Sequence, residues 1–531
     1  MKKVCSCLML IWIFVLGGCA TKPITESSFS DKEIVLDQAN AKAKGAKSWF
    51  NASNEAKQKF RQKYNGEIEP ATAFYLEHDT YIYEDKKIVA YLQKIIDRLL
   101  QGWQGEKPEL FVVLITDEFF NAYVDELNQL HVTTGLLRNV ENEDQLAAIL
   151  AHEISHILLK HNPEKSSVNS VTSGLEMSAI IAETASIIMG EEDLGKQAWF
   201  GFTSLGLVWA DLLSPDWSRK NELEADKMGM DLLMRANYNY EQFPVVLEKI
   251  GDGEGKKSAH LNKMIKGLDP SEQPDASTKE QSAALTKKLN DEIASKNKSH
   301  EDRATRIKAL KNYLNTAHAG GELPPVNSEA EFRSTIYDPI SKALLDQDLK
   351  AIETINALSL RDVERAKTKS ATLSDLNLVS SRIAKSSVEI SEKNYGGAIN
   401  NLRLLTDHNY APAEAYIKLA SVYMEEKKYD EAGKILNLGI KRIGRNYKFL
   451  PAQINLYKTS GDTKTAEETT IKCRDYDKTV LLSSESGDAY YKNCVTILGH
   501  DPDEKVLVPV AKKVLPIIPS VLPVIDLLRM F

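Results

Sequence analysis

Residues 143–158 read EDQLAAILAHEISHIL, a run that predicts one apolar helix carrying two histidines a turn apart. Positions i and i+4 lie on one face of a helix, so His152 and His156 can reach the same metal ion while Glu153 projects beside them. A catalytic zinc ion takes three protein ligands and keeps one position open for water. The H-E-x-x-H pattern therefore predicts a site for one Zn²⁺ and requires a third ligand from elsewhere in the chain.

A second predicted helix, over residues 218–234, offers that ligand. Glu222 can complete a set of two histidines and one carboxylate, and Asp226 lies one turn further on the same face. Asp226 can accept a hydrogen bond from the distal nitrogen of a ligand imidazole and so fix the ring orientation. We expect Glu224 to point away from this face into solvent, and His161 to serve in capping or packing near the end of the first helix.

These residue types in this arrangement predict peptide hydrolysis. Zinc lowers the pKa of the water it binds towards ~7 and polarises a substrate carbonyl. Glu153 would take the proton of the attacking water and return it to the leaving amine. A further donor should stabilise the tetrahedral oxyanion.

The composition indicates an ordinary globular protein with more than one domain. The 531 residues are too many for a single compact core, and 43% are hydrophobic while 27% are charged. The formal net charge of -8, without a long basic run, argues against a nucleic-acid partner. A buried strand is predicted over residues 110–115, and a second over 121–137 runs into a turn, so a small β-sheet precedes the helix of 143–158.

The N-terminus predicts export and a lipid anchor. Two lysines and an apolar run precede Leu16-Gly17-Gly18-Cys19, which resembles a bacterial lipobox. We therefore expect a lipoprotein signal peptide over residues 1–18, a lipid on Cys19, and a tether over 19–65; the alternatives are an ordinary signal peptide or a short membrane anchor. Position 20 is Ala, whereas many lipoproteins that stay in the inner membrane have Asp at this position. This difference predicts that the chain lies at the periplasmic face of the outer membrane.

Two cysteines remain once the signal peptide and the lipid acceptor are set aside. Cys473 and Cys494 form an even pair in an oxidising compartment, which predicts a disulfide. The alternative is two buried free thiols.

The C-terminal part of the chain is predicted to be all α. Alanines 398, 432 and 466 recur at an interval of 34 residues, and the surrounding large and small residues fit the tetratricopeptide pattern over residues 379–480. The alternative is a generic helical array, and the third unit is degraded as expected of a terminal cap. We expect a linker with connecting helices over 316–378, and a C-terminal tail over 481–531 in which prolines interrupt aliphatic runs.

The motifs of the first half resemble a zinc metallopeptidase family, the one that contains the CAAX prenyl proteases, HtpX and a mitochondrial inner-membrane protease. The resemblance covers about residues 70 to 312. It rests on Asn121-Ala122, Thr134-Gly135-Leu136-Leu137, Glu143-Asp144-Gln145-Leu146-Ala147, His152-Glu153-x-x-His156, Glu222-x-x-Ala225-Asp226 and Ser299-His300-Glu301-Asp302-Arg303. It implies a gluzincin-type domain over residues 66–315, mainly helical with a small β-sheet, in which Glu222 is the third metal ligand.

A lipoprotein signal and C-terminal repeats make the chain similar to periplasmic members of that family. The similarity implies a zinc-dependent endopeptidase in quality control or assembly of outer-membrane proteins. Its clients would be unfolded or misassembled outer-membrane proteins, and its repeats would hold these clients or the β-barrel assembly machinery. The competing hypothesis is a chaperone or scaffold with a latent protease site; a third is a small-peptide aminopeptidase.

The chain departs from the family pattern in two places. Residues 126–128 occupy a stretch where many relatives have a glycine pair, which concerns substrate preference. Relatives also carry a His-Pro pair a few residues before a final arginine, and that histidine can act at the metal site. With Arg303 as that arginine, Asn297-Lys298 stands at the pair. Either His300 takes over or the oxyanion and gating role is lost.

Overall fold

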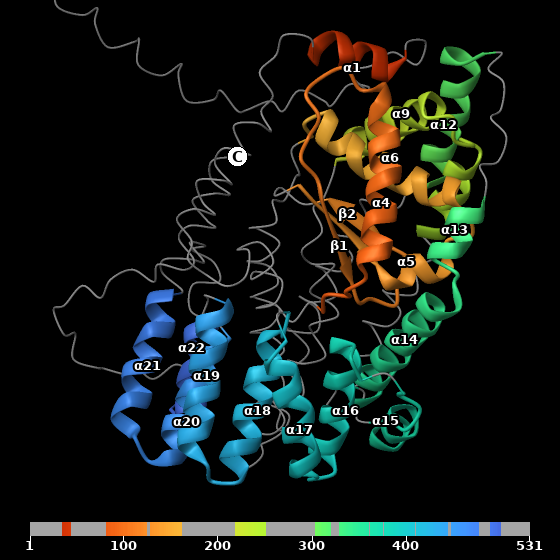
Figure 1. Cartoon of the computed structure of the whole chain (residues 1–531). Helices are drawn as coiled ribbons and strands as arrows, with labels where there is room; N and C mark the ends of the chain where they lie inside the picture. Colours follow the sequence, from red (N-terminus) through yellow and green to blue (C-terminus); the bar gives the residue numbers. More distant parts are fainter. Residues whose placement is uncertain are drawn as a thin grey trace, which may run out of the picture.

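The computed structural model describes residues 34–43, 81–124, 128–161, 218–250, 303–319, 329–359, 362–374, 376–408, 410–443, 448–476 and 489–500. Over these ranges the chain is mainly helical with one small β-sheet, as predicted (Figure 1). The expected signal peptide, Cys19, and residues 501–531 of the expected tail lie outside the described residues. Among the described residues, none of the helices combines the length and the hydrophobicity of a membrane span.

We call the first group of elements the N-terminal body. Its helices are α1 (Val35–Ala43), α4 (Lys86–Leu99), the 3-10 turn η1 (Leu100–Gly102), α5 (Thr134–Asn139), α6 (Glu143–Leu158), α9 (Arg219–Arg235), α12 (Arg303–Ala317) and α13 (Glu329–Thr335). Its strands are β1 (Phe111–Ile115), β2 (Ala122–Val124) and β3 (Gln129–Thr133). Helices α4, α6, α9 and α12 gather beside the sheet (Figure 1).

The sheet has the order β1-β3-β2, with β3 parallel to β1 and antiparallel to β2. The two predicted strand regions thus form three strands. The second region was expected to run into a turn. Instead, β3 ends at Thr133 and helix α5 follows directly. The hydroxyl of Thr133 accepts the N–H of Leu136 at 3.0 Å and so caps α5. In the described sheet β2 pairs only with β3, so it is an edge strand; β1, at the other edge, also forms a bridge between Ile82 and Ile115.

Side chains alternate between two buried faces of the sheet. Leu114, Leu130 and Val132 belong to the core shared with the helices of the N-terminal body. Ile115 and Tyr123 belong to a second core, shared with the C-terminal helices. The sheet that adjoins the predicted site is therefore packed from both sides.

Helix α1 lies within the segment expected to be a tether. Its first residues are buried: the backbone N–H of Val35 donates to the hydroxyl of Tyr313, and that of Leu36 to the carboxylate of Asp231, each at 2.9 Å. Within the expected tether, this stretch is thus docked onto α9 and α12 by two apolar side chains and two satisfied backbone groups.

We call the second group the C-terminal array. It comprises α14 (Pro339–Ser359), α15 (Val363–Ser370), α16 (Val379–Ser391), α17 (Tyr395–Thr406), α18 (Ala413–Glu425), α19 (Tyr429–Ile443), α20 (Phe449–Ser460), α21 (Thr463–Tyr476) and α22 (Ala489–Leu498). Helix α14 runs from the N-terminal body into a row of helices that ends at α21 (Figure 1).

The turns of this array repeat with the period seen in the sequence. Lys393, Lys427 and Gly461 adopt positive φ and are spaced by 34 residues. In each case the following residue donates its N–H to the carbonyl five residues back, which closes the same helix-ending turn. Ala398, Ala432 and Ala466 are all fully buried. The interval of 34 residues is thus a backbone period of helical hairpins.

A buried ion pair lies where the array meets the N-terminal body. Glu414 and Lys418 of α18 are 2.8 Å apart with side chains 3% and 2% exposed, and Glu414 also accepts from the hydroxyl of Tyr81 at 2.9 Å. Nearby, Thr116 donates to Asp348 of α14 at 2.8 Å. The two parts are therefore joined by directional polar contacts as well as by the shared apolar core.

Glu414→Ala should destabilise this junction strongly. It removes the acceptor of Tyr81 and leaves the ammonium of Lys418 buried without its partner carboxylate, a loss of about 3–5 kcal/mol in the free energy of unfolding. Urea unfolding measures it. Glu431→Ala, at an exposed position of α19, is the matched control and should change the value by less than about 0.5 kcal/mol. Equal losses for the two substitutions would contradict a stabilising role of the Glu414–Lys418 pair at this junction.

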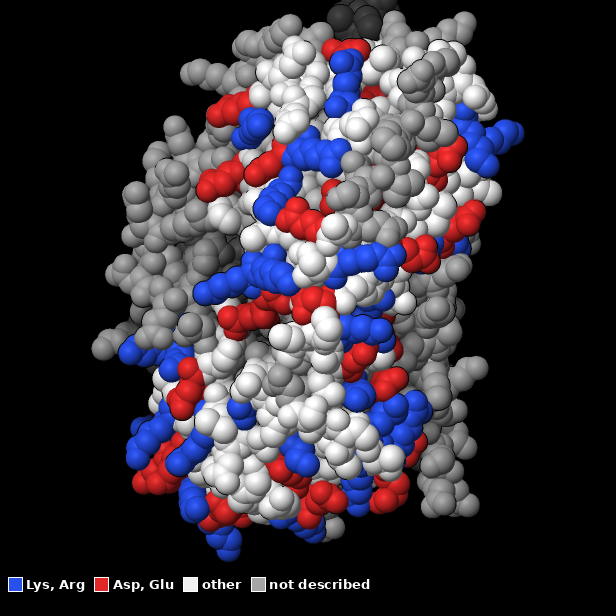
Figure 2. Space-filling view, turned by 45° about the vertical axis from the view of Figure 1, so that its right-hand side comes forward, with Lys and Arg blue, Asp and Glu red and all other residues white. Residues whose placement is uncertain are grey.

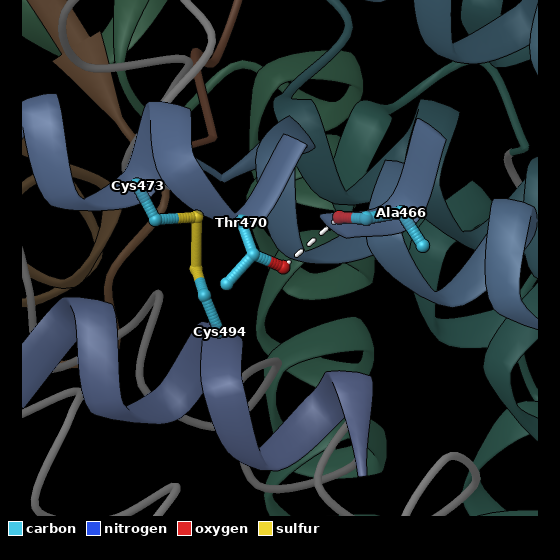
Figure 3. Close-up of a disulfide and its surroundings, with 4 residues drawn as sticks. All are labelled: Ala466, Thr470, Cys473 and Cys494. Carbon is cyan, nitrogen blue, oxygen red and sulfur yellow. Dashed lines mark hydrogen bonds between the residues drawn. A yellow bond between two sulfur atoms is a disulfide. The ribbon is translucent and has the colours of Figure 1, made fainter. Parts of the chain in front are cut away.

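A disulfide between Cys473 and Cys494 joins α21 to α22 (Figure 3). Both cysteines are fully buried. Beside them, Thr470 donates its hydroxyl to the carbonyl of Ala466 at 3.0 Å, which satisfies a polar group in the place where the repeat would put a leucine. On the face of the molecule shown in Figure 2, acidic and basic side chains are interspersed.

Candidate metal centre

Helix α6 carries the first part of the site and is buried along almost its whole length. Asn142 caps its start by accepting the N–H of Gln145 at 2.8 Å, and the Gln145 side chain accepts the N–H of Glu141 at 3.1 Å. Every residue from Asp144 to Leu158 is buried. A helix that is buried on every face belongs to the core, so its two histidines are held in an interior with little freedom.

Helix α9 carries the second part and crosses α6 closely. Ser218 caps its start by accepting the N–H of Asn221 at 3.1 Å, which sets Glu222 in the first turn. At Gly229 a Cβ would lie 3.2 Å from the backbone nitrogen of His152. The absence of a side chain there lets the backbone of α9 approach α6 next to the H-E-x-x-H motif.

His152, His156 and Glu222 converge as the sequence predicts. The two Nε2 atoms lie 3.2 Å apart, and Glu222 oxygens lie 3.6 Å from Nε2 of His152 and 3.6 Å from Nε2 of His156. Ligands about 2.0–2.1 Å from a tetrahedral zinc ion are separated by roughly 3.3 Å. The three side chains are buried and within range of one ion, so their spacing fits a metal.

Asp226 and Arg306 brace this set. Asp226 Oδ1 lies 3.0 Å from Nδ1 of His152, as the sequence predicts. Arg306 donates to both Asp226 oxygens, at 2.8 and 2.7 Å, and its Nη1 lies 2.7 Å from Glu222 Oε2. Burial acts to raise the pKa of the Asp226 carboxyl, but Arg306 and His152 outweigh it and lower that pKa to about 2. Asp226 is therefore held ionised.

Arg306 corrects the register proposed from the sequence. Arg303 was taken as the final arginine of the family pattern, but its guanidinium donates to the backbone carbonyl of Glu248 at 3.3 Å. Arg306, one turn further along α12, is the residue that reaches the site. Moving the pattern by three residues places its histidine at His300 instead of Asn297. Both positions lie outside the described residues.

Glu153 lies in the same buried interior, 7% exposed. Burial raises the pKa of its carboxyl to about 7, with the nearby Glu222 carboxylate adding to the rise and His152 opposing it. The carboxylate accepts a hydrogen bond from the backbone N–H of Val124 on the edge strand β2. The proposed base is thus tied to the strand that borders the site.

The expectation for Glu224 was wrong, and His161 does more than the packing expected of it. Glu224 was expected in solvent, but its side chain is only 7% exposed. His161 was expected to cap or pack; its ring packs against that of His156. In addition, its Nδ1 lies 3.1 Å from Nδ1 of His156 and its Nε2 lies 3.4 Å from Glu224 Oε2. Lys160, at φ 56°, turns the chain at the end of α6 and brings His161 back to the ligand. The sequence signal that could have indicated this contact was the presence of a histidine five residues after His156.

The comparisons with known proteins agree with this geometry. Residues 87–314 match the family model described as Peptidase family M48. The chain is 25% identical to the Beta-barrel assembly-enhancing protease of Escherichia coli over 171 residues, which cover 32% of this chain and 34% of that protein. It is 30% identical to the Mitochondrial metalloendopeptidase OMA1 of Schizosaccharomyces pombe over 173 residues, 32% of this chain and 46% of that protein. The matches therefore span less than half of either relative.

Proposed function

We propose that this chain, which carries a Peptidase family M48 domain, is a zinc-dependent endopeptidase that acts on unfolded or misassembled outer-membrane proteins in the periplasm. The observation that carries the proposal is the buried set of His152, His156 and Glu222 at tetrahedral spacing, with Glu153 on the same helix. Two histidines and one carboxylate form a ligand set of zinc peptidases, and three protein ligands leave a position for water.

The proposed chemistry assigns a role to each side chain. When bound, zinc supplies a Lewis acid that polarises the peptide carbonyl and lowers the pKa of water towards ~7. Glu153 takes the proton of the attacking water and delivers it to the leaving amine. Asp226 holds His152 through Nδ1, and Arg306 holds Asp226 and Glu222 in place. His300 is our candidate for the donor that stabilises the oxyanion.

The edge strand β2 supports an extended peptide as substrate. Asn121 donates its N–H to the hydroxyl of Thr133 on β3, and its carbonyl accepts the backbone N–H of Thr133. Because the backbone groups of successive residues in a strand point to opposite sides, those of Ala122 and Val124 point away from β3. On that outer side the N–H of Val124 reaches Glu153. A peptide added to this edge would pair through its backbone, which favours unfolded clients over folded ones.

Four observations support the proposed cellular setting and partners. The lipobox around Cys19 favours a lipid anchor at the outer membrane, and the buried Cys473–Cys494 disulfide favours an oxidising compartment. The hairpin period of 34 residues favours tetratricopeptide repeats, which would grip clients or the β-barrel assembly machinery. One relative is a β-barrel assembly-enhancing protease by name.

Cleavage of a urea-unfolded outer-membrane protein by the purified chain tests the proposal. We expect fragments on gel electrophoresis, complete inhibition by the chelator 1,10-phenanthroline, and recovery when stoichiometric Zn²⁺ is returned. A chain that prevents aggregation of the client equally well with and without the chelator, and never cuts it, would instead support the scaffold hypothesis. Comparing clients with free and blocked N-termini separates an endopeptidase from an aminopeptidase.

A further inference from the structure

We propose that His161 and Glu224 are positioning residues for the metal ligand His156. This inference rests on the proposed zinc site. His161 lies outside α6 and Glu224 sits between Glu222 and Asp226 on α9, yet the structure brings both to the side of His156 that faces away from the other ligands. The side chains of His161 and Glu224 are 5% and 7% exposed.

The direction of the hydrogen bonds follows from the ligand atom. Nε2 of His156 is the nitrogen that points to His152 and Glu222, so it is the one available to the metal. A neutral imidazole carries one N–H, so the proton of His156 must be on Nδ1. Nδ1 of His156 therefore donates to Nδ1 of His161, 3.1 Å away. The proton of His161 is then on Nε2, which faces Glu224 Oε2 at 3.4 Å.

This chain of contacts parallels the one on the other histidine. Nδ1 of His152 lies 3.0 Å from Asp226, which Arg306 holds. Each ligand imidazole thus has a partner on its distal nitrogen, a carboxylate directly for His152 and a carboxylate through a second imidazole for His156. Such partners fix the tautomer and the ring orientation, and losing one typically weakens metal binding by ~10–100-fold.

Local backbone geometry supports a built arrangement. His161 donates its backbone N–H to the carbonyl of His156 at 3.0 Å, and Lys160 donates to Ile157 at 3.0 Å, which closes the turn at the end of α6. The hydrogen bond from His161 to the carbonyl of His156 thus also places the two imidazole rings against each other, with ring centroids 5.1 Å apart.

Zinc affinity, measured by competition with a chromophoric chelator, tests the inference without relying on activity. His161→Leu should raise the zinc dissociation constant by ~10–100-fold, while the thermal unfolding midpoint of the zinc-free chain stays close to the native one. His161→Asn, whose amide oxygen can accept from Nδ1 of His156, should recover most of the affinity. Glu224→Gln keeps an acceptor without the charge and should give an intermediate value.

Ser155→Ala is the matched control, since Ser155 is buried on α6 but donates to the carbonyl of Ala151. It should leave zinc affinity unchanged. Unaltered affinity in both His161→Leu and Glu224→Gln would overturn the inference, as would a lowered unfolding midpoint of the zinc-free His161→Leu chain with unaltered affinity. If His161→Leu fails to fold, Glu224→Gln and His161→Asn decide. A native chain that binds no zinc would overturn the proposed function itself.

Discussion

Glu153→Gln is expected to bind zinc like the native chain and to cleave an unfolded outer-membrane protein about 10²–10⁴-fold more slowly, the range attributed to a positioned general base. Glutamine has the shape of glutamate and can accept the hydrogen bond from Val124, but it cannot take a proton from water. Glu153 is not among the three converging side chains, so zinc content should remain. Initial cleavage rates and zinc content of the same preparations measure both effects.

Glu241→Gln provides the control for this change. Glu241 is exposed, so its replacement should leave cleavage and zinc content unaltered. Cleavage by Glu153→Gln at the native rate would contradict the role given to Glu153. Loss of zinc from that variant would show instead that Glu153 contributes to the metal site.

Arg306→Met is expected to cost about 3–5 kcal/mol in the free energy of unfolding, because it strips a buried pair of carboxylates of their cation. The side chain of Arg306 is 9% exposed, and those of Glu222 and Asp226 are 5% and 1% exposed. Methionine fills a similar volume but donates no hydrogen bond. Urea unfolding of the zinc-free chain measures the change without a contribution from the metal.

Arg303→Met, one turn earlier on α12, is the matched control. Its guanidinium donates to a backbone carbonyl at 3.3 Å, so we expect a loss below about 1 kcal/mol. A larger loss for Arg303→Met than for Arg306→Met would restore the register first proposed from the sequence. The comparison therefore tests which arginine belongs to the site.

The centre of the site could be predicted from sequence because it depends on local periodicity. His152 and His156 share a helix face by spacing alone, and Glu222 and Asp226 share another. Both helices begin at residues whose side chains cap them, Asn142 and Ser218. These local rules do not require knowledge of how the helices pack.

The residues that sequence reasoning missed depend on tertiary packing. Glu224 was expected in solvent because it lies off the face of Glu222, but α9 is covered on several sides, so its other faces are buried as well. Arg303 and Arg306 are equivalent in sequence terms, and only the crossing of α12 over α9 selects Arg306. His161 follows the last turn of α6, and the positive φ of Lys160 decides where it points.

The packing partners of the sheet could not be predicted from the sequence either. Strand β1 was predicted from its apolar run, but the core formed by Ile115 and Tyr123 with the C-terminal array joins residues hundreds of positions apart. The helical hairpins of that array were predictable because their period repeats in the sequence. Their position against the sheet depends on single contacts such as Tyr81 with Glu414.

Zinc content after gel filtration in metal-free buffer tests the central claim most directly, with the native chain and Glu222→Gln compared side by side. We predict one zinc ion per native chain and almost none in Glu222→Gln, whose carboxamide is a poor metal ligand, with circular dichroism unchanged. Full zinc content in Glu222→Gln, or a native chain without zinc, would contradict the assignment of His152, His156 and Glu222 as the metal site.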